Sequence, residues 1–465
     1  MKTSLEQGRR ASLRRPGTRL GRFGRLVLTG AASMLLWQSA WALLPIEHWS
    51  EPSGAQVWLV HSPAIPMVDV QIDFDAGSRR DPAAQAGLAS AAAMMSAKGV
   101  QADGDAPALD ENALGQAWAD LGASLDAGAD RDALSFSLRS LTEPDLLARA
   151  AQLAAREIGQ PSLDAGVWTS ERARWQASLR EADTRPGTIA SKAYAAAVYG
   201  GQSYGQRPSA QTLDAIGIAD MQAWRAHYLQ ACRARVSIVG AVDRAQAQTL
   251  VQTLLSRLPQ QDAGGCAPLP AVPDAQPLKT AEQESIPFHS AQAHVLIGQP
   301  GIKRSDPDFL ALLVGNHILG GGSFTSRLMQ QVREQRGLSY SVGSGFSPGL
   351  NVGAFTVALQ TRPDQAKEAV RVTREVIAKF VADGPTEAEL RAAKDNLIGG
   401  FALRIDSNRK LLGNVANIAW NGLPLDYLDH WTERVQALTL PDVRAAMQRT
   451  LQPERMVTVI VGGQP

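Results

Sequence analysis

Two stretches of the chain, Arg235-Val-Ser-Ile-Val-Gly240 and Val457-Thr-Val-Ile-Val-Gly462, share one pattern: an apolar, β-branched run that ends in glycine. Such runs are typical of strands that are buried on both faces. An aspartate precedes each run in the same register, because the spacing from Asp220 to Gly240 equals the spacing from Asp442 to Gly462. In each copy we expect the aspartate to cap a helix that leads into the strand. Two features in one register indicate that the body of the chain is a duplication.

The rest of the body alternates strands with long helices in both copies. Val68-Asp-Val-Gln-Ile-Asp-Phe74 alternates as a half-buried strand does, and His294-Val-Leu-Ile-Gly298 opens the second copy similarly. Proline, aspartate or a capping box begins several predicted helices. These helices span 81–98, 110–121, 144–158 and 162–182 in the first copy and 306–319, 363–383 and 386–404 in the second. The pattern predicts two α/β or α+β domains.

A proline-rich segment separates the two copies. Residues 256–285 contain a Gly-Gly pair and five prolines: Pro259, Pro268, Pro270, Pro273 and Pro277. This composition favours an extended connector over a packed element. We therefore expect an N-terminal domain over 43–255, a linker over 256–285 and a C-terminal domain over 286–465.

Charge is unevenly distributed along the 465 residues. The chain carries 46 Lys and Arg against 45 Asp and Glu, but residues 1–42 alone hold eight of the basic residues and one acid. The remaining 38 basic and 44 acidic residues give 43–465 a net charge of −6. A mildly acidic body argues against nucleic acid as a partner. The chain has only two cysteines, which excludes a disulfide-built scaffold and a zinc site made only of thiolates.

The first 42 residues have the features of a cleaved export signal. An arginine-rich region precedes an apolar run from Leu26 to Trp37, and Ala40-Trp41-Ala42 supplies small residues for a cleavage site before Leu43. The alternatives are a membrane anchor and a basic arm, although the run is short for a spanning helix. We expect a periplasmic mature protein that is not inserted in the membrane. In that compartment the two cysteines could oxidise together, and the sequence leaves their pairing open.

One stretch of the first copy carries a family resemblance. Ala76-Gly77-Ser78-Arg79, then Gly87-Leu88-Ala89 and Lys98-Gly99, is similar to the region around the metal-binding helix of the insulinase/pitrilysin family of zinc peptidases. This family includes the mitochondrial processing peptidases and short bacterial members built from two related domains. The resemblance covers nearly all of residues 45–465. It implies an α+β fold of two homologous domains, each a mainly antiparallel sheet packed with helices, that form a clam-like pair.

The metal-binding motif itself is missing. Active members carry His-x-x-Glu-His directly after Gly-Leu-Ala, where two histidines hold zinc and the glutamate activates water. Here the three positions read Ser90, Ala93 and Met94. The third ligand of the family is a glutamate seven residues after another glutamate; Glu171 matches the first, and Ser178 stands at the ligand position. No two of the seven histidines are spaced i, i+4, so we expect no metal site in this chain.

The second copy keeps the family's other signature. Residues 316–342 are similar to it over their whole length: Asn-His-Ile-Leu-Gly-Gly-Gly-Ser-Phe-Thr-Ser-Arg-Leu-Met-Gln-Gln-Val-Arg-Glu-Gln-Arg-Gly-Leu-Ser-Tyr-Ser-Val. Active members use an Arg and, seven residues later, a Tyr, which are Arg333 and Tyr340 here. The resemblance implies that the guanidinium holds a substrate carbonyl or carboxylate and that the phenol stabilises an oxyanion. Taken singly, the two residues would equally suit a solvated helix charge and a packed strand aromatic. We expect Arg327 and Arg336 to be structural or exposed.

Local patterns predict how this signature folds. The Gly320-Gly321-Gly322 turn lacks the Gly-Lys-Ser/Thr of a phosphate loop, and we expect it to end one helix and begin the next. Gly337 is expected to end that second helix. Leu338, Tyr340 and Val342 are then expected to alternate onto one face of a strand.

The chain has thus lost the motif that bears the chemistry and kept the motif that handles substrate. We hypothesise that it is the zinc-free subunit of a heterodimeric peptidase, inactive alone, whose homologous partner binds the zinc. Arg333 and Tyr340 would act in trans on peptide substrates. One alternative is a non-catalytic scaffold or peptide-binding protein with the same fold. The other, a solitary zinc peptidase, needs ligands that the sequence does not contain.

Overall fold

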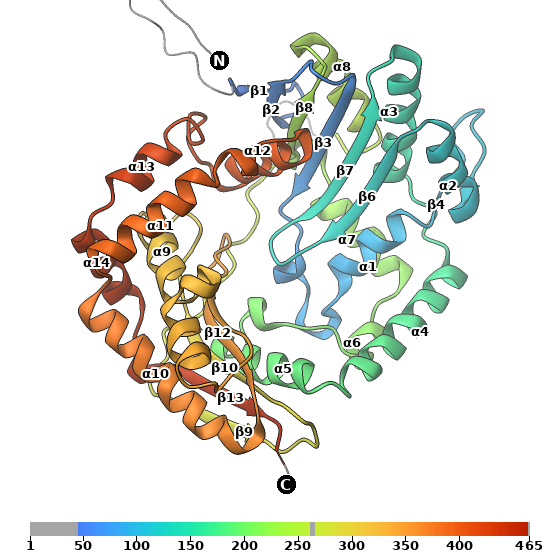
Figure 1. The fold of residues 1–465 in the computed structure, drawn as a ribbon. Helices are drawn as coiled ribbons and strands as arrows, with labels where there is room; N and C mark the ends of the chain where they lie inside the picture. Colours follow the sequence, from blue (N-terminus) through green and yellow to red (C-terminus); the bar gives the residue numbers. More distant parts are fainter. Residues whose placement is uncertain (1–44, 261–265, 464–465) are drawn as a thin grey trace, which may run out of the picture. The chain divides into compact units, whose positions relative to one another are not determined.

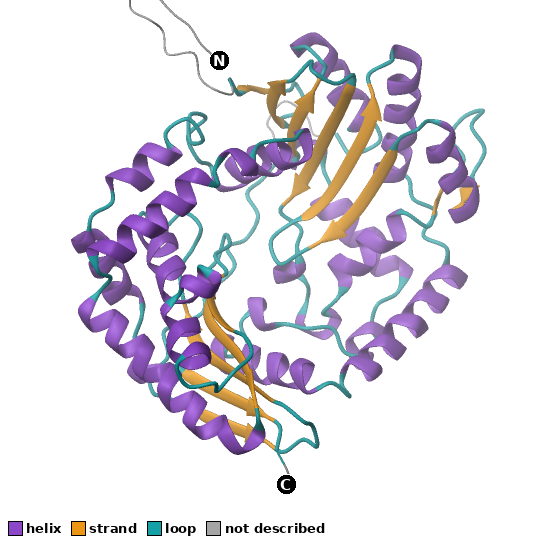
Figure 2. Cartoon of the chain, in the orientation of Figure 1, coloured by secondary structure: helices purple, strands orange, loops and turns teal. Residues whose placement is uncertain are grey.

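The computed structural model describes residues 45–260 and 266–463 (Figure 1). The predicted export signal, residues 1–42, lies outside the described residues and stays a prediction. The described chain combines helices and strands throughout (Figure 2). None of its helices is both long and apolar enough to cross a membrane.

The strands form two large sheets, one in each half of the chain. The first-half strands are β1 (Glu47–Ser50), β2 (Gln56–His61), β3 (Met67–Phe74), β6 (Ser124–Ala129), β7 (Leu134–Leu141) and β8 (Arg235–Gly240). The second-half strands are β9 (Gln283–Ile286), β10 (Ala293–Pro300), β11 (Val342–Phe346), β12 (Ala354–Thr361) and β13 (Val457–Val461). A small separate sheet pairs β4 (Gly99–Val100) with β5 (Leu109–Asp110).

The two large sheets repeat one topology. Their strand orders are β1-β2-β8-β3-β7-β6 and β11-β12-β10-β13-β9. If β2, β3, β6, β7 and β8 correspond to β9, β10, β11, β12 and β13, the orders are the same. Each sheet also has a single parallel pair, β2 with β8 and β13 with β9, and is otherwise antiparallel. The predicted α+β fold of two related, mainly antiparallel sheets is confirmed.

The helices keep the same repeat. The first half contains α1 (Leu88–Ser96), α2 (Glu111–Asp120), α3 (Pro144–Gly159), α4 (Ala165–Ala182), α5 (Pro186–Tyr199), α6 (Ala210–Asp214), α7 (Ile218–Tyr228) and α8 (Arg244–Leu254). The second half contains α9 (Phe309–Asn316), α10 (Ala366–Asp383), α11 (Glu387–Gly399), α12 (Asn408–Asn421), α13 (Trp431–Ala437) and α14 (Leu440–Thr450). One constant offset in residue number, the same that separates Asp220 from Asp442, relates the first residues of α3, α4, α5 and α7 to those of α10, α11, α12 and α14, respectively.

Two predictions about where helices begin are wrong. Asp220 and Asp442 are not the N-cap residues of α7 and α14; their carboxylates accept the backbone N–H of the N-cap residues Gly217 and Thr439, each at 2.8 Å. The Thr439 hydroxyl accepts the Asp442 backbone N–H in return and completes a capping box, whereas Gly217 has no side chain to do so. The helix predicted over 81–98 begins only at α1. Its N-cap, Gly87, has a φ of +110°, a left-handed conformation that interrupts the helix.

The glycines that end β8 and follow β13 are required by close packing. Gly240 and Gly462 have φ values of +155° and +138°. A Cβ atom on Gly240 would collide with the backbone of Met67, and one on Gly462 would collide with the backbone of Ala293. The same strand-end geometry in both copies explains the repeated pattern of the two runs.

One helix of each half packs on the sheet of the other half (Figure 1). α12 packs on β8 and β3 of the first sheet, where Arg235 stacks on Trp420, with 4.8 Å between the guanidinium carbon and the ring centroid. α5 packs on β10 and β13 of the second sheet, and the Tyr194 hydroxyl donates a hydrogen bond to the Phe355 carbonyl at 2.9 Å. Each sheet therefore lies between its own helices and an exchanged helix, so β8 and β13 are buried along almost their whole length. β3 is apolar on one face, and its other face carries the buried carboxylates of Asp69 and Asp73.

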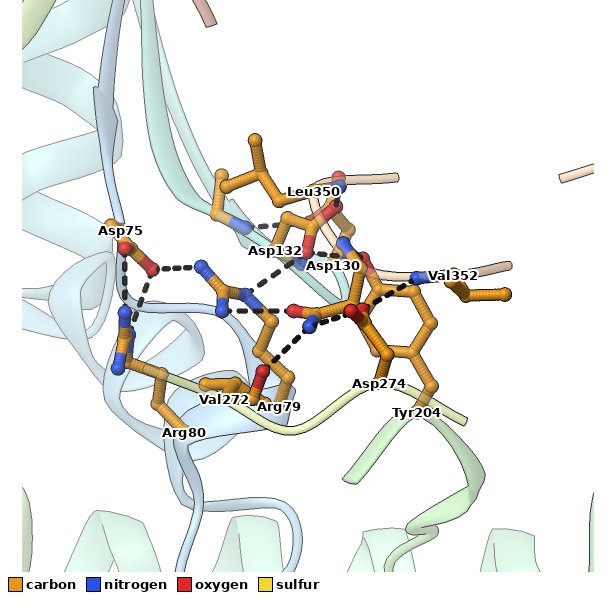
Figure 3. A network of polar contacts seen from close by, with 12 residues as sticks. Asp75, Arg79, Arg80, Asp130, Asp132, Tyr204, Val272, Asp274, Leu350 and Val352 are labelled. Atoms are coloured by element: carbon orange, nitrogen blue, oxygen red, sulfur yellow. Dashed lines mark hydrogen bonds and ion pairs between the residues drawn. The ribbon is translucent and has the colours of Figure 1, made fainter. Parts of the chain in front are cut away.

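A buried polar network joins the two halves and residues of the predicted linker (Figure 3). The Arg79 guanidinium forms ion pairs with Asp75 and Asp132 and donates a hydrogen bond to Asn351 at 3.1 Å. The Asn351 side chain donates in turn to the Asp274 carboxylate at 2.8 Å. Burial raises the pKa of Asp132, although its hydrogen bonds and the Arg79 charge act in the opposite direction.

A disulfide joins the first half to the first part of the predicted linker, residues 256–285. Cys232 and Cys266, whose Cα atoms are 5.7 Å apart, form the bond that the sequence left open. The described residues that follow are irregular up to β9, which begins inside the predicted 256–285 linker and joins the second sheet beside β13.

Candidate functional site

The helix that would bear the metal site, α1, is mostly buried and carries no metal-binding side chain. Ala93 is buried, whereas Ser90 and Met94 are half-buried. The remaining residues of α1 are apolar or small, and the helix packs against β6, β7 and α7. At the three motif positions α1 therefore offers neither an imidazole nor a carboxylate.

The second part of the family's metal site, on α4, also lacks a free ligand. Ser178 is exposed. The Glu171 carboxylate forms ion pairs with Lys98 at 3.0 Å and Arg174 at 2.7 Å. Lys98 also pairs with Glu111 at 2.7 Å, and this hydrogen bond is the largest cause of the raised pKa of Lys98. Within the part of the chain that the structure describes, no three His, Cys, Asp or Glu side chains are grouped to hold a metal. These residues do not fit zinc.

The second-half signature folds into two π-helical segments joined by a glycine turn. The first π-helical segment, η5 (His317–Gly321), continues directly from α9. The second, η7 (Met329–Glu334), follows the glycine turn. A side chain on Gly320 would collide with Ser344, so the turn needs glycine there. Ser323, which follows the glycines, has a φ of +54°, a strained value for a residue with a Cβ. The turn ends one helix and begins the next, as predicted, and such π segments and strain are frequent at functional sites.

The signature brings Arg333 and Tyr340 together, with a third residue that the sequence analysis missed. The Arg333 guanidinium carbon lies 4.9 Å from the ring centroids of both Phe324 and Tyr340. The two rings are unusually open to solvent, with Phe324 59% and Tyr340 80% exposed. No acidic side chain of the described residues pairs with Arg333. A guanidinium stacked on aromatic faces keeps its in-plane N–H groups free for a ligand.

Tyr340 does not occupy the strand position that we predicted. Leu338 and Val342 are buried, but β11 begins only at Val342, and Tyr340 precedes it with its ring exposed. The cause is Ser339, whose buried hydroxyl lies 2.6 Å from the Ser341 carbonyl oxygen and 2.7 Å from the Gln360 carbonyl oxygen and shares its one proton between them. These bonds hold residues 338–341 in an irregular conformation. The prediction that Tyr340 shares a face with Leu338 and Val342 is wrong, whereas Gly337, with a φ of +61°, ends the helix as predicted.

The neighbouring arginines have the roles that we expected. Arg327 forms a bidentate ion pair with Glu389, with both contacts at 2.7 Å. Burial acts to raise the pKa of Glu389, but the hydrogen bonds from Arg327 and Thr386 outweigh it and lower the pKa to about 2. Arg336 is exposed and contacts Gln331. Arg333 differs from Arg327 in having no carboxylate partner among the described residues and from Arg336 in being stacked between two rings.

Comparisons with known proteins identify the family. The family model described as the peptidase M16 inactive domain matches residues 215–397. The crystal structure of a peptidase M16 inactive domain from Pseudomonas fluorescens is 32% identical to this chain, with a TM-score of 0.84, and the match covers 91% of this chain and 99% of that one. The chain belongs to the M16 peptidases, the insulinase/pitrilysin family that its motifs indicate.

Curated relatives include proteins with and without a peptidase name. An uncharacterized zinc protease of Streptomyces coelicolor is 29% identical over 282 residues, which cover 59% of this chain and 60% of that protein. The non-peptidase homolog YmxG of Helicobacter pylori is 34% identical over 156 residues, or 33% of this chain and 35% of that protein. The chain thus spans less than two thirds of the length of each of these curated relatives. The match to an inactive M16 domain and the side chains at the metal positions fit a chain that has no zinc of its own.

Proposed function

We propose that this chain is the zinc-free subunit of an exported heterodimeric M16 peptidase. Its partner is a homologous subunit that carries His-x-x-Glu-His and supplies zinc-activated water for peptide hydrolysis. This chain contributes Arg333, which binds the substrate backbone, and Tyr340, which donates a hydrogen bond to the developing oxyanion.

The main support for this proposal is the environment of the Arg333 guanidinium. Its guanidinium is oriented by two aromatic rings, is not neutralised by any acid among the described residues, and lies next to solvent. Such a group can bind a carbonyl or carboxylate with little loss of conformational freedom, because stacking has already restricted it. In the same chain α1 has no side chain that could activate water. The two observations together favour a subunit that handles substrate for another subunit's reaction.

Two features support export. The first 42 residues have the composition of a cleavable signal. The Cys232–Cys266 disulfide suits an oxidising compartment such as the periplasm.

The test is peptide hydrolysis by this chain, by a zinc-bearing M16 subunit from the same organism, and by their mixture. We expect the mixture to hydrolyse quenched fluorescent peptides, with full inhibition by a chelator, and this chain alone to be inactive. Arg333→Ala in this chain should lower kcat/KM of the mixture about 10- to 100-fold, since it removes charge-assisted hydrogen bonds. Arg336→Ala, a matched exposed control on the same turn, should leave the rate unchanged.

Two outcomes would overturn the proposal. The first is chelator-sensitive hydrolysis by this chain alone. The second is an active mixture whose rate does not respond to Arg333→Ala. That second result would favour a non-catalytic scaffold with the same fold, the alternative supported by the match to a non-peptidase homolog.

A further inference from the structure

A buried arginine without a carboxylate partner lies in the first half, on α7. The Arg225 side chain is 7% exposed, and burial lowers its pKa to about 10. Its guanidinium donates hydrogen bonds to the Ser96 hydroxyl at 2.7 Å and to the Ile158 carbonyl. These acceptors lie at the C-terminal ends of α1 and α3, whose partial negative charge helps to hold the cation. No described carboxylate forms an ion pair with it.

The second half shows that the fold does not need this charge. The offset that relates α7 to α14 places Met447 at the position of Arg225, and the Met447 side chain is fully buried. α14 packs on α9 as α7 packs on α1, and Met447 lies against Gly315 of α9. The same helix packing is therefore achieved with an apolar side chain. Because burying a charge is costly, an arginine at this position calls for a reason other than packing.

Arg225 lines a cavity of about 570 Å³ that contains a second unsatisfied group. Gln160, which follows α3, also lines the cavity, and its buried side-chain oxygen has no hydrogen-bond partner. Gln222, Ser256 and Arg257 complete a polar wall. The volume lies within the range of pockets that hold small molecules. An unpaired acceptor and a cation with unused donors thus line one space.

We infer that this cavity is a binding site for a small zwitterion, an α-amino acid or a dipeptide. The ligand's carboxylate accepts hydrogen bonds from Arg225, which has five N–H donors and two protein acceptors. The ligand's ammonium group donates to the Gln160 side-chain oxygen, which is buried and becomes accessible from the cavity when the Gln160 side chain rotates toward it. A ligand with both groups satisfies the two features that the protein leaves open, whereas a simple anion satisfies only one. The site shares no residue with the Arg333 cluster and does not depend on the proposed peptidase role.

The test is calorimetric titration of the purified chain with glycine and glycylglycine, with acetate, methylammonium and inorganic phosphate as comparison ligands. We expect saturable binding of at least one zwitterion at about 1 mM or below, weaker binding of acetate and no binding of methylammonium. Arg225→Met, which installs the side chain of the second half, should weaken zwitterion binding at least about 10-fold. Gln160→Leu should abolish the preference for the zwitterion over acetate. Arg149→Met, an exposed arginine on α3, should bind as the unaltered chain does.

Three results would contradict the proposed zwitterion site. Absence of zwitterion binding, equal binding by Arg225→Met, or phosphate binding as tight as that of the zwitterions would each overturn the inference. If thermal unfolding shows that Arg225→Met does not fold, the loss of ligand preference in Gln160→Leu, with Arg149→Met unchanged, decides the question. Either result leaves the peptidase test unaffected, because that test measures hydrolysis and Arg333.

Discussion

The two halves of the chain share one skeleton and differ in where they place charge. Their sheets have the same order, and four pairs of helices begin at one constant offset. The first half buries Glu157 and Arg225, whereas the second half has an exposed Lys379 and an apolar Met447 at the corresponding positions. Conversely, among the residues that the structure describes, only the second half has an arginine that stacks on two exposed aromatic rings, namely Arg333. Apolar runs and strand-end glycines therefore preserve the fold in both halves, while the charged groups that differ between the halves lie at other positions.

The largest effect should come from the exposed phenol of the second half. In the mixture with the proposed zinc-bearing partner, Tyr340→Phe should lower kcat about 10²–10³-fold, because it removes the proposed donor to the oxyanion. The thermal unfolding midpoint should not change, because the ring is 80% exposed and its hydroxyl forms no hydrogen bond to another described residue. The measurement is steady-state hydrolysis with the variant and the unaltered chain in parallel. A rate within twofold of the unaltered complex would mean that the second half contributes no catalytic donor.

A smaller effect, on the pH dependence of stability, is expected from Glu157, the buried acid of the first half. Burial raises the pKa of Glu157 to about 7 from 4.5, even though the hydrogen bond from Trp118 at 2.9 Å opposes it. A raised pKa in the folded state means that the neutral form stabilises the fold at low pH, and that this contribution disappears as pH rises through about 7. The loss corresponds to roughly 3 kcal/mol. Glu157→Gln, which still accepts from Trp118, should remove most of this decline.

Urea unfolding at about pH 5 and about pH 8 measures the difference. Burial also raises the pKa of Asp81, to about 6. The free energy of unfolding of the variant should therefore still decline somewhat as pH rises. Lys379→Gln at the corresponding exposed position is the matched control and should keep the full pH dependence. If the free energy of unfolding declined equally with pH in Glu157→Gln and in the unaltered chain, the two halves would not differ in buried charge as described.

The smallest effect tests the exchange of helices between the halves. The buried Tyr194 hydroxyl of α5 contacts the Phe355 carbonyl and the Thr356 hydroxyl of β12, each at 2.9 Å. Tyr194→Phe should lower the free energy of unfolding by about 1–2 kcal/mol. Because each sheet is covered by a helix of the other half, fluorescence and circular dichroism should report one shared, shifted transition. Two transitions, of which only one moves, would contradict this account. Tyr228→Phe, whose hydroxyl makes no hydrogen bond to a described residue, should change stability by less than about 0.5 kcal/mol.

Much of the fold could be predicted because its signals are local. Prolines, capping residues and alternating strands act within a few residues, and they predicted the β3 strand and α2, α3 and α4 close to their observed bounds. The exchanged helices α5 and α12 were not predicted, because what stabilises them is a sheet in the other half of the sequence. A signal was nevertheless present: Gly200 and Gly422, which the constant offset also relates, end these helices in left-handed conformations with φ of +56° and +61°.

The candidate functional residues differ in the same way in how far the sequence predicts them. Arg333 and Tyr340 could be identified because they belong to one continuous motif, and the structure places them in contact. Phe324 was missed because a strained turn, with no periodic pattern, brings it to Arg333. Arg225 was missed because its partners, Ser96 and Ile158, come from distant helices. The exposure of Tyr340 depends on the bonds of the Ser339 hydroxyl, which the alternating pattern does not reveal.

The most direct test of the contrast between the halves is the zinc content of the freshly purified chain, compared with that of the proposed zinc-bearing partner prepared in the same way. The metal positions Ser90, Ala93, Met94 and Ser178 supply no histidine, glutamate or other strong ligand. Mass spectrometry of the isolated chain should therefore find far less than one zinc per molecule, whereas the proposed partner should hold one. One tightly held zinc per molecule of this chain, with loss of structure when a chelator removes it, would contradict the account.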